Sequence, residues 1–296
     1  MKKYIVCALF LGVFAQARAQ QLQTSSMYDL QGVFHNPSTA GVRNSMAGVS
    51  YRTQWSGISG SPRTATAFGS FSLPSLKIGI GGYVYNDKTG PTSRTGLQLA
   101  FAKHIPAGEG TFSLGIEARG QQYSLDRAKL TATLGSDPAI GTSENRFVFD
   151  AGFGISYTNK KLQLGASVSN LVQTKLGFYT GNLTTSETAR MYRHYFFHGS
   201  YKWDVDGSTT ITPNFLVIYL PNAPTEFQGG VRVEHKELFF WGLSLRAKQS
   251  FMLSAGLHIN KKLTVGYAFD IYQTPLSVFD KGANAHEMLL RYNFVK

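Results

Sequence analysis

The chain has 296 residues, of which 43% are hydrophobic and only 16% charged, and its formal net charge is +12 at pH 7. Phe (21), Tyr (15) and Gly (31) are abundant, and the mean hydropathy is -0.13. This much apolar sequence excludes a disordered chain, a single cysteine (Cys7) excludes a disulfide scaffold, and the lack of any apolar run of about 18 residues excludes bilayer-spanning helices.

The first nineteen residues have the pattern of a secretory signal peptide. Lys2 and Lys3 form a basic start, residues 4–14 are apolar, and Ala17-Arg18-Ala19 is typical of a cleavage site. The sequence therefore predicts a mature chain that begins near Gln20, contains no cysteine, and falls from a net charge of +12 to +9 as three basic residues are removed. An uncleaved membrane anchor is the alternative.

The next segment, 20–45, does not alternate as a strand would. It contains Asn36-Pro37-Ser38-Thr39-Ala40-Gly41, in which Pro37 fixes a backbone turn and Ala40-Gly41 permits another chain to approach closely. We predict that 20–45 is a periplasmic or plug-like segment, with 33–44 able to fold into the mouth of the domain that follows.

From residue 46 onward, hydrophobicity alternates with the period of two that is typical of β-strands. Between 76 and 85, one face carries Leu, Ile and Val and the other carries Lys, Gly and Tyr, and similar alternation returns in 112–121, 147–157 and 263–271. Fourteen strands are predicted at about 46–55, 64–73, 76–86, 94–105, 111–123, 145–158, 162–170, 191–203, 208–219, 226–235, 238–247, 250–259, 263–272 and 285–294.

The predicted connections alternate between short turns and longer loops, as they do in outer-membrane barrels. Short turns rich in strand-breaking residues are predicted at 74–75, 106–110, 159–161, 204–207, 236–237 and 260–262. Longer loops are predicted at 56–63, 87–93, 124–144, 171–190, 220–225 and 273–284. Only the short connection at Lys248-Gln249 departs from this rule. Because the number of strands is even, both termini are expected on the periplasmic side.

A soluble β-sandwich also alternates, but two features favour a membrane barrel. The apolar faces begin or end in aromatic residues, as interface girdles do: Trp55, Tyr157, Tyr219, Trp241, Tyr267, Tyr292 and Phe294. The opposite faces carry Gly, Ser, Thr and Gln, whereas a soluble surface would carry many Lys and Glu. We therefore predict an all-β, transmembrane antiparallel outer-membrane β-barrel of about 14 strands over 46–296, preceded by the plug-like segment 20–45 and the signal peptide 1–19.

Seven charged residues fall on strand faces that are predicted to point into the lumen: Arg94, Glu117, Arg119, Asp150, Arg232, Glu234 and Arg246. They could form ion pairs that hold the barrel rigid, or they could line a passage. In an exported chain, the basic net charge favours anionic lipid headgroups or an acidic partner over nucleic acid.

The sequence indicates no catalytic, metal or cofactor site. His198 and Ser200 share a strand face, but no third group that would orient them is identifiable, so we interpret both as lumen lining. The histidines lack the spacing of a metal site. Gly79-x-Gly81-Gly82 lies within a strand and is therefore not a phosphate-binding loop.

Two stretches resemble the N-terminal signature of the PorP/SprF family of Bacteroidetes outer-membrane proteins. Residues 34–41 read Phe-His-Asn-Pro-Ser-Thr-Ala-Gly, and 51–64 read Tyr-Arg-Thr-Gln-Trp-Ser-Gly-Ile-Ser-Gly-Ser-Pro-Arg-Thr. Ser38 stands where an Ala is more usual, and 87–91, Asp-Lys-Thr-Gly-Pro, is similar to a second family feature. The residues that carry the likeness are Asn36, Pro37, Gly41, Tyr51, Arg52, Gln54, Trp55, Gly57, Gly60 and Pro62.

This resemblance implies a barrel of the type IX secretion system and, in some members, of gliding motility. It implies help in exporting or anchoring large surface proteins that bear C-terminal sorting domains, together with periplasmic components of that system. It carries no catalytic or ligand-binding residue, and the motif residues could be structural or partner-binding; Arg52 and Gln54 could hydrogen-bond a plug formed by 33–44. The alternative is a fatty-acid-transporter-like barrel for uptake of a hydrophobic or small substrate, because an Asn-Pro-small stretch also precedes such barrels.

Overall fold

The computed structural model describes residues 25–294 except 127, 131–144, 177–189, 222, 275 and 280–283. The expected signal peptide lies outside the described residues, as do most of the loops predicted at 124–144 and 171–190. Among the residues that are described, no helix is both long enough and apolar enough to span a membrane.

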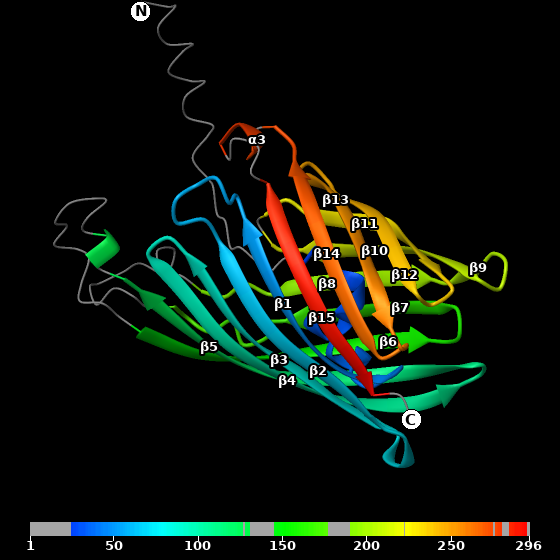
Figure 1. Ribbon diagram of the computed structural model, residues 1–296. Coiled ribbons are helices and arrows are strands. Elements are labelled where there is room, and N and C mark those ends of the chain that lie inside the picture. Colours follow the sequence, from blue (N-terminus) through cyan, green and yellow to red (C-terminus); the bar gives the residue numbers. More distant parts are fainter. Residues whose placement is uncertain are drawn as a thin grey trace, which may run out of the picture.

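The described strands form one closed antiparallel barrel (Figure 1). Strands adjacent in sequence pair with one another, except that β8 and β9 both pair with β10. Because β1 pairs with β15, the sheet closes on itself. The strands are β1 (Ser45–Gln54), β2 (Arg63–Leu73), β3 (Ile78–Thr89), β4 (Thr92–Ala107), β5 (Gly110–Leu125), β6 (Asn145–Thr158), β7 (Leu162–Ser169), β8 (His194–Tyr201), β9 (Trp203–Asp204), β10 (Thr209–Tyr219), β11 (Glu226–His235), β12 (Phe239–Arg246), β13 (Ser250–Ile259), β14 (Leu263–Tyr272) and β15 (Ala285–Phe294).

The predicted fourteen-strand barrel is confirmed. The longer loop expected at 87–93 is wrong, because β3 extends to Thr89 and β4 begins at Thr92, which leaves only the two-residue turn Gly90-Pro91. One predicted strand also differs. The strand expected at 191–203 is two segments, β8 and the two-residue β9, which both pair with β10 on either side of a break at Lys202. Because β9 continues the course of β8, the fifteen segments correspond to fourteen strands in the wall of the barrel.

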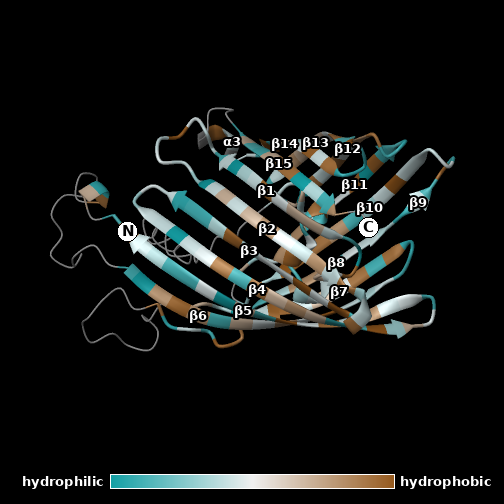
Figure 2. Ribbon diagram, turned by 60° about the horizontal axis from the view of Figure 1, so that its bottom comes forward, coloured by the Kyte–Doolittle hydropathy of each residue, from teal (hydrophilic) through white to brown (hydrophobic). Residues whose placement is uncertain are grey.

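Apolar side chains cover the outside of the barrel, because lipid and not water is its solvent. On β14, Val265, Tyr267 and Ile271 are exposed, while Thr264 and Asp270 on the opposite face are fully buried. Figure 2 shows hydrophobic and hydrophilic colours alternating along the strands. The outward apolar and inward polar faces are those that the alternation predicts for a transmembrane barrel.

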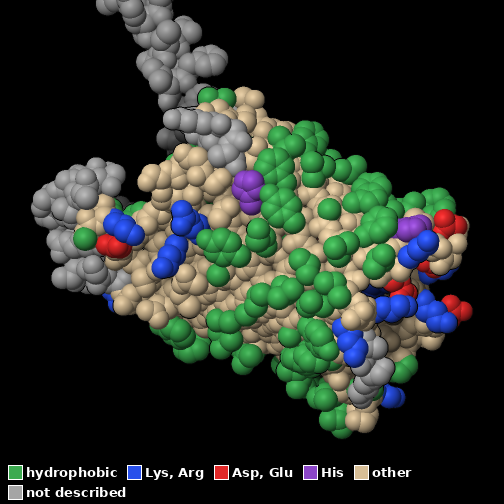
Figure 3. Space-filling model, viewed as in Figure 1, with side chains coloured by type: hydrophobic (Ala, Val, Ile, Leu, Met, Phe, Trp, Pro, Cys, Tyr) green, Lys and Arg blue, Asp and Glu red, His purple; other side chains and the backbone are tan. Residues whose placement is uncertain are grey.

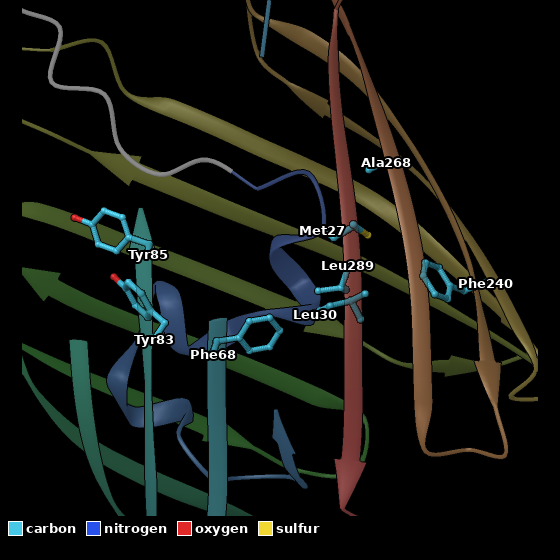
Figure 4. Close-up of a cluster of buried hydrophobic side chains, with 8 residues drawn as sticks. All are labelled: Met27, Leu30, Phe68, Tyr83, Tyr85, Phe240, Ala268 and Leu289. Carbon is cyan, nitrogen blue, oxygen red and sulfur yellow. The ribbon is translucent and has the colours of Figure 1, made fainter. Parts of the chain in front are cut away.

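The segment before β1 lies inside the barrel, and we call residues 25–44 the plug. It contains three short 3-10 turns, η1 (Tyr28–Leu30), η2 (Gly32–Phe34) and η3 (Pro37–Thr39). Met27 and Leu30 pack against Phe68, Phe240 and other inward side chains of the barrel wall, in the cluster of Figure 4. The main hydrophobic core of this barrel is therefore formed between the plug and the wall.

The barrel has two different ends. Short connections, including η4 (Pro74–Leu76), lie at the end where Ser45 pairs with Phe294, which we call the turn end. The longer connections, including α3 (Leu276–Phe279), lie at the loop end. The Ser25 hydroxyl donates to Glu287, two residues from the loop end of β15. The plug therefore runs along the lumen from near the loop end to the turn end.

Candidate functional site

A row of small residues makes a flat seat for the plug near the turn end. Gly79, Ala102, Gly115, Gly154 and Ser167 are successive register partners on β3 to β7. We call this row the glycine seat. Since all five side chains are small or absent, the plug backbone can lie directly against the wall.

Added side-chain atoms in the glycine seat would collide with the plug. A Cβ on Gly115 would meet the backbone of Ser38, and one on Gly154 would meet the Asn36 side chain, both far inside van der Waals contact. Gly41, which follows η3, has a φ of 63°, and its own Cβ would meet the Phe71 carbonyl. These positions therefore require glycine on both sides of the contact.

Asn36 joins the plug to three strands through one side chain. Its Oδ1 accepts from the Ser38 amide at 3.0 Å, which caps η3, and Pro37 occupies the first position of that turn. Its Nδ2 donates to the carbonyls of Ile155 (3.0 Å) and Ala166 (3.3 Å) and lies 3.0 Å from His198 Nε2. The amide is fully buried, so each of these bonds is made away from water. His198 thus contacts a structural amide of the plug.

The start of the plug is held by a buried charge cluster at the loop end. Arg52 on β1 donates to Asp270 at 2.6 Å and to Ser26 of the plug at 2.6 Å, and it lies 3.3 Å from Glu287. Glu287 also accepts from the Ser26 amide at 2.7 Å and from the Ser25 hydroxyl at 2.6 Å. Since all these groups are nearly inaccessible to water, the charges depend on one another for compensation.

A second ion pair joins the middle of the plug to β11. Arg232 makes a bidentate contact with Asp29, at 2.7 and 2.6 Å, and its guanidinium lies 4.5 Å from the centre of the Phe240 ring. Bidentate arginine–carboxylate pairs restrain geometry in addition to contributing energy. The plug is therefore fixed along its whole length by a cluster, an ion pair and the glycine seat.

The other inward charges also have partners within the lumen. Arg119 lies 3.0 Å from Glu117, Arg246 lies 3.2 Å from Glu226, Arg94 lies 3.5 Å from Asp87, and Glu234 lies 3.7 Å from His258. Asp150 accepts from the amides of Ala151 and Val172. The structure thus gives each of the seven charged residues that the sequence places in the lumen a polar partner, which is a backbone amide for Asp150 and a histidine for Glu234. Among the described residues, no three His, Cys, Asp or Glu side chains come together as a metal site.

The sequence reasoning missed the acidic partners in the plug and on β14 and β15. Asp270 and Glu287 lie on the buried faces of β14 and β15, along which hydrophobicity alternates. The every-second-residue pattern that identified Arg232 as lumen-facing could therefore have identified them too. Asp29 lies in a segment without strand periodicity, and no sequence signal pairs it with Arg232.

Above the plug, toward the loop end, the lumen contains a cavity of about 600 Å³. Phe34 and His35 of the plug line it, together with Tyr83, Arg94, Arg119 and His194 of the wall. Burial lowers the pKa of His35 to about 3, so this imidazole is neutral at physiological pH. Burial also raises the pKa of the Tyr28 phenol, which therefore stays neutral, so the charged side chains of the plug are Asp29 and Arg43.

Comparison with known proteins assigns this barrel to a family. A family model described as "Type IX secretion system membrane protein PorP/SprF" matches residues 17–292, nearly the whole chain. The chain belongs to the PorP/SprF family. No curated protein matches it.

Two solved structures are similar to this PorP/SprF barrel, and the first of them confirms its fold. The Ralstonia pickettii toluene transporter TbuX has a TM-score of 0.50 and 10% identity over 88% of this chain and 92% of that one. The Acinetobacter baumannii outer membrane protein Omp33 has a TM-score of 0.48 and 8% identity over 86% of this chain and 100% of that one. At such low identity, the likeness concerns the outer-membrane barrel fold alone.

In this PorP/SprF barrel, the motif residues divide between the lumen and the first loop. Arg52 enters the charge cluster, whereas Tyr51 faces outward. The Gln54 amide donates to the Pro62 carbonyl at 3.0 Å, and Trp55 packs near Tyr272. Gly60, with a φ of 76°, accepts from the Gly90 amide of the next loop, and Gly57 lies in the exposed turn between.

Arg52 and Gln54 do not make the hydrogen bonds to residues 33–44 that the sequence suggested. Arg52 meets the plug at Ser26, and the Gln54 side chain accepts from the Tyr272 hydroxyl at 3.3 Å. The reason is the direction of the plug: its start, and not 33–44, lies beside the loop end of β1.

Proposed function

We propose that this barrel assists type IX secretion, either by helping to export large proteins with C-terminal sorting domains or by holding them at the cell surface, and that it also serves gliding motility. The family match over residues 17–292 carries the proposal. The plug supports it, because a segment fixed by buried ion pairs and a glycine seat suits a docking body better than an open pore.

We place the barrel in the outer membrane of a Gram-negative bacterium, with the turn end in the periplasm. Outer-membrane barrels have short periplasmic turns and longer external loops, which supports this orientation. The start of β1 and the carboxyl terminus then lie on the periplasmic side, within reach of periplasmic secretion components. Ser25, the first described residue, lies near the loop end, so this placement concerns the start of β1 and the end of β15. The secreted or surface protein would meet the loop end.

Deletion of the protein tests this function. We expect viable cells whose surface and medium lack particular proteins with C-terminal sorting domains, measured by comparative surface proteomics. One of those proteins should copurify with the detergent-extracted barrel. A surface proteome unchanged by the deletion would contradict the proposal.

A second candidate function is uptake of a hydrophobic or small substrate through the lumen. The cavity of about 600 Å³ at the loop end and the fold likeness to TbuX, described as a toluene transporter, favour it. Such a substrate needs a path past Asn36 and the glycine seat. Equal uptake of toluene and of a fatty acid by wild-type and deletion strains would count against this candidate.

A further inference from the structure

The lipid-facing surface carries a broad apolar depression that crosses β12 to β15 and β1 to β4. Its volume is about 1290 Å³, and among its lining residues are Val49, Ala65, Ala67, Val84 and Leu290. Figure 3 looks onto β14, β15, β1 and β2, where hydrophobic side chains gather between the two ends of the barrel. The depression lies over β2 because the small side chains of Ala65 and Ala67 leave the sheet uncovered there, whereas the neighbouring strands carry larger side chains.

Two basic side chains lie directly beyond the depression, toward the loop end. Arg63 on β2 and Lys88 on β3 are register partners, and each lies two residues along its strand from a lining residue, Ala65 or Asn86. A spacing of two keeps side chains on the same face, so both cations point outward, and both are exposed. The surface therefore changes from apolar to cationic within one residue pair, about 7 Å along the strand.

The Arg63–Lys88 pair is not compensated by the described part of the protein. Like charges opposite one another on adjacent strands are destabilising. The nearest acidic residue in sequence, Asp87, faces the lumen, where it accepts from Thr64 and pairs with Arg94. No described residue forms an ion pair with Arg63 or Lys88, so an external anion at this point would relieve their repulsion.

We propose that this face binds one phosphorylated glycolipid of the outer leaflet, with a phosphate between Arg63 and Lys88 and acyl chains in the depression. This rests on the orientation proposed above, which places the loop end at the outer leaflet. A lipid of this class supplies an anion at the membrane interface and apolar chains immediately below it, in the order found on β2 and β3. A protein that covers only the apolar part would leave the two cations unneutralised.

Lipid binding by the purified full-length barrel tests this site. The barrel is extracted in mild detergent, and native mass spectrometry measures the occupancy of added phosphorylated glycolipid, its dephosphorylated form, and phosphatidylglycerol. We expect the phosphorylated glycolipid to bind wild type at least about tenfold more tightly than either of the others, which corresponds to about 1.4 kcal/mol. Equal binding of phosphatidylglycerol would overturn the proposal, because the site would then recognise the negative charge of a lipid and not the phosphorylated glycolipid.

Variants locate the binding to this face. The double substitution Arg63→Gln/Lys88→Gln should reduce binding of the phosphorylated glycolipid about tenfold, and Ala67→Trp, which fills the depression, should reduce it independently. The matched control Lys160→Gln/Lys161→Gln removes the same charge from an exposed turn at the other end of the barrel and should leave binding unchanged. Equal loss in the control would overturn the proposal. Export of surface proteins is measured in the same strains, so a failure of lipid binding is separable from a failure of the secretion role.

Discussion

At the scale of single residues, Arg52 is the side chain that compensates most of the buried negative charge at the loop end. It lies between Asp270 and Glu287, both fully buried, and within the described part of the chain only Arg246, 3.9 Å from Asp270, offers another cation. Removal of one partner of a buried ion pair leaves an uncompensated charge, which typically costs about 3–5 kcal/mol.

We therefore predict that Arg52→Met lowers the free energy of unfolding by about 3 kcal/mol. Urea unfolding of the barrel in lipid vesicles measures this change. Lys160→Met, at an exposed turn, is the control and should change stability by less than about 0.5 kcal/mol. A loss in Arg52→Met no larger than in the control would mean that the cluster contributes nothing to the folded state.

His35 makes the stability of the plugged barrel depend on pH. Its pKa is about 3 in the folded protein, lowered by burial from the ordinary value of 6.5. Between these two values the unfolded chain binds more protons, so His35 stabilises the fold above pH 6.5 and this contribution is lost as the pH falls. The groups around it include His198 and Arg119, which disfavour a further positive charge.

On lowering the pH from 7.5 to 5, wild type should lose about 2 kcal/mol more unfolding free energy than His35→Gln, since one pKa unit corresponds to about 1.4 kcal/mol. Urea unfolding at the two pH values measures both losses, and the carboxylates common to the two proteins cancel in the comparison. Equal losses would show that His35 is protonated without cost, contrary to its burial.

At the scale of elements, the alternation of hydrophobicity was sufficient to predict the strands but not the path of the plug. The limits predicted for β6, β11, β13, β14 and β15 agree with the structure, because outward side chains must be apolar and inward ones small or polar at every second position. The break at Lys202 has no such signal. The path of the plug and the glycine seat were not predictable, because 3-10 turns have no strand periodicity and the seat depends on register across five strands.

The glycine seat leads to a prediction about the plug as an element. Gly115→Ala/Gly154→Ala should displace η3 from the wall, because both added methyl groups collide with plug atoms. We expect a higher single-channel conductance in planar bilayers than for wild type. Gly120→Ala is the control, since a Cβ there meets the Phe147 and Phe149 rings and no atom of the plug among its nearest neighbours. Unchanged conductance in the double variant would mean that the seat does not hold the plug in the lumen.

At the scale of the whole molecule, the two ends of the barrel differ enough to fix its orientation experimentally. The only cysteine, Cys7, lies in the expected leader, so single cysteines introduced into the mature chain report accessibility without background. Ser59 is exposed in the loop between β1 and β2 at the loop end, and Lys160 is exposed in the turn between β6 and β7 at the turn end.

Short turns belong to the periplasmic side of such barrels, so we predict that a membrane-impermeant maleimide labels Ser59→Cys in intact cells and labels Lys160→Cys only after the outer membrane is permeabilised. Labelling of both variants in purified, detergent-extracted barrel controls for reactivity. The opposite pattern in intact cells would invert the barrel, and it would contradict the outer-leaflet lipid site because the Arg63–Lys88 pair would then lie at the inner leaflet. The same two variants therefore test the orientation on which both the secretion role and the outer-leaflet lipid site depend.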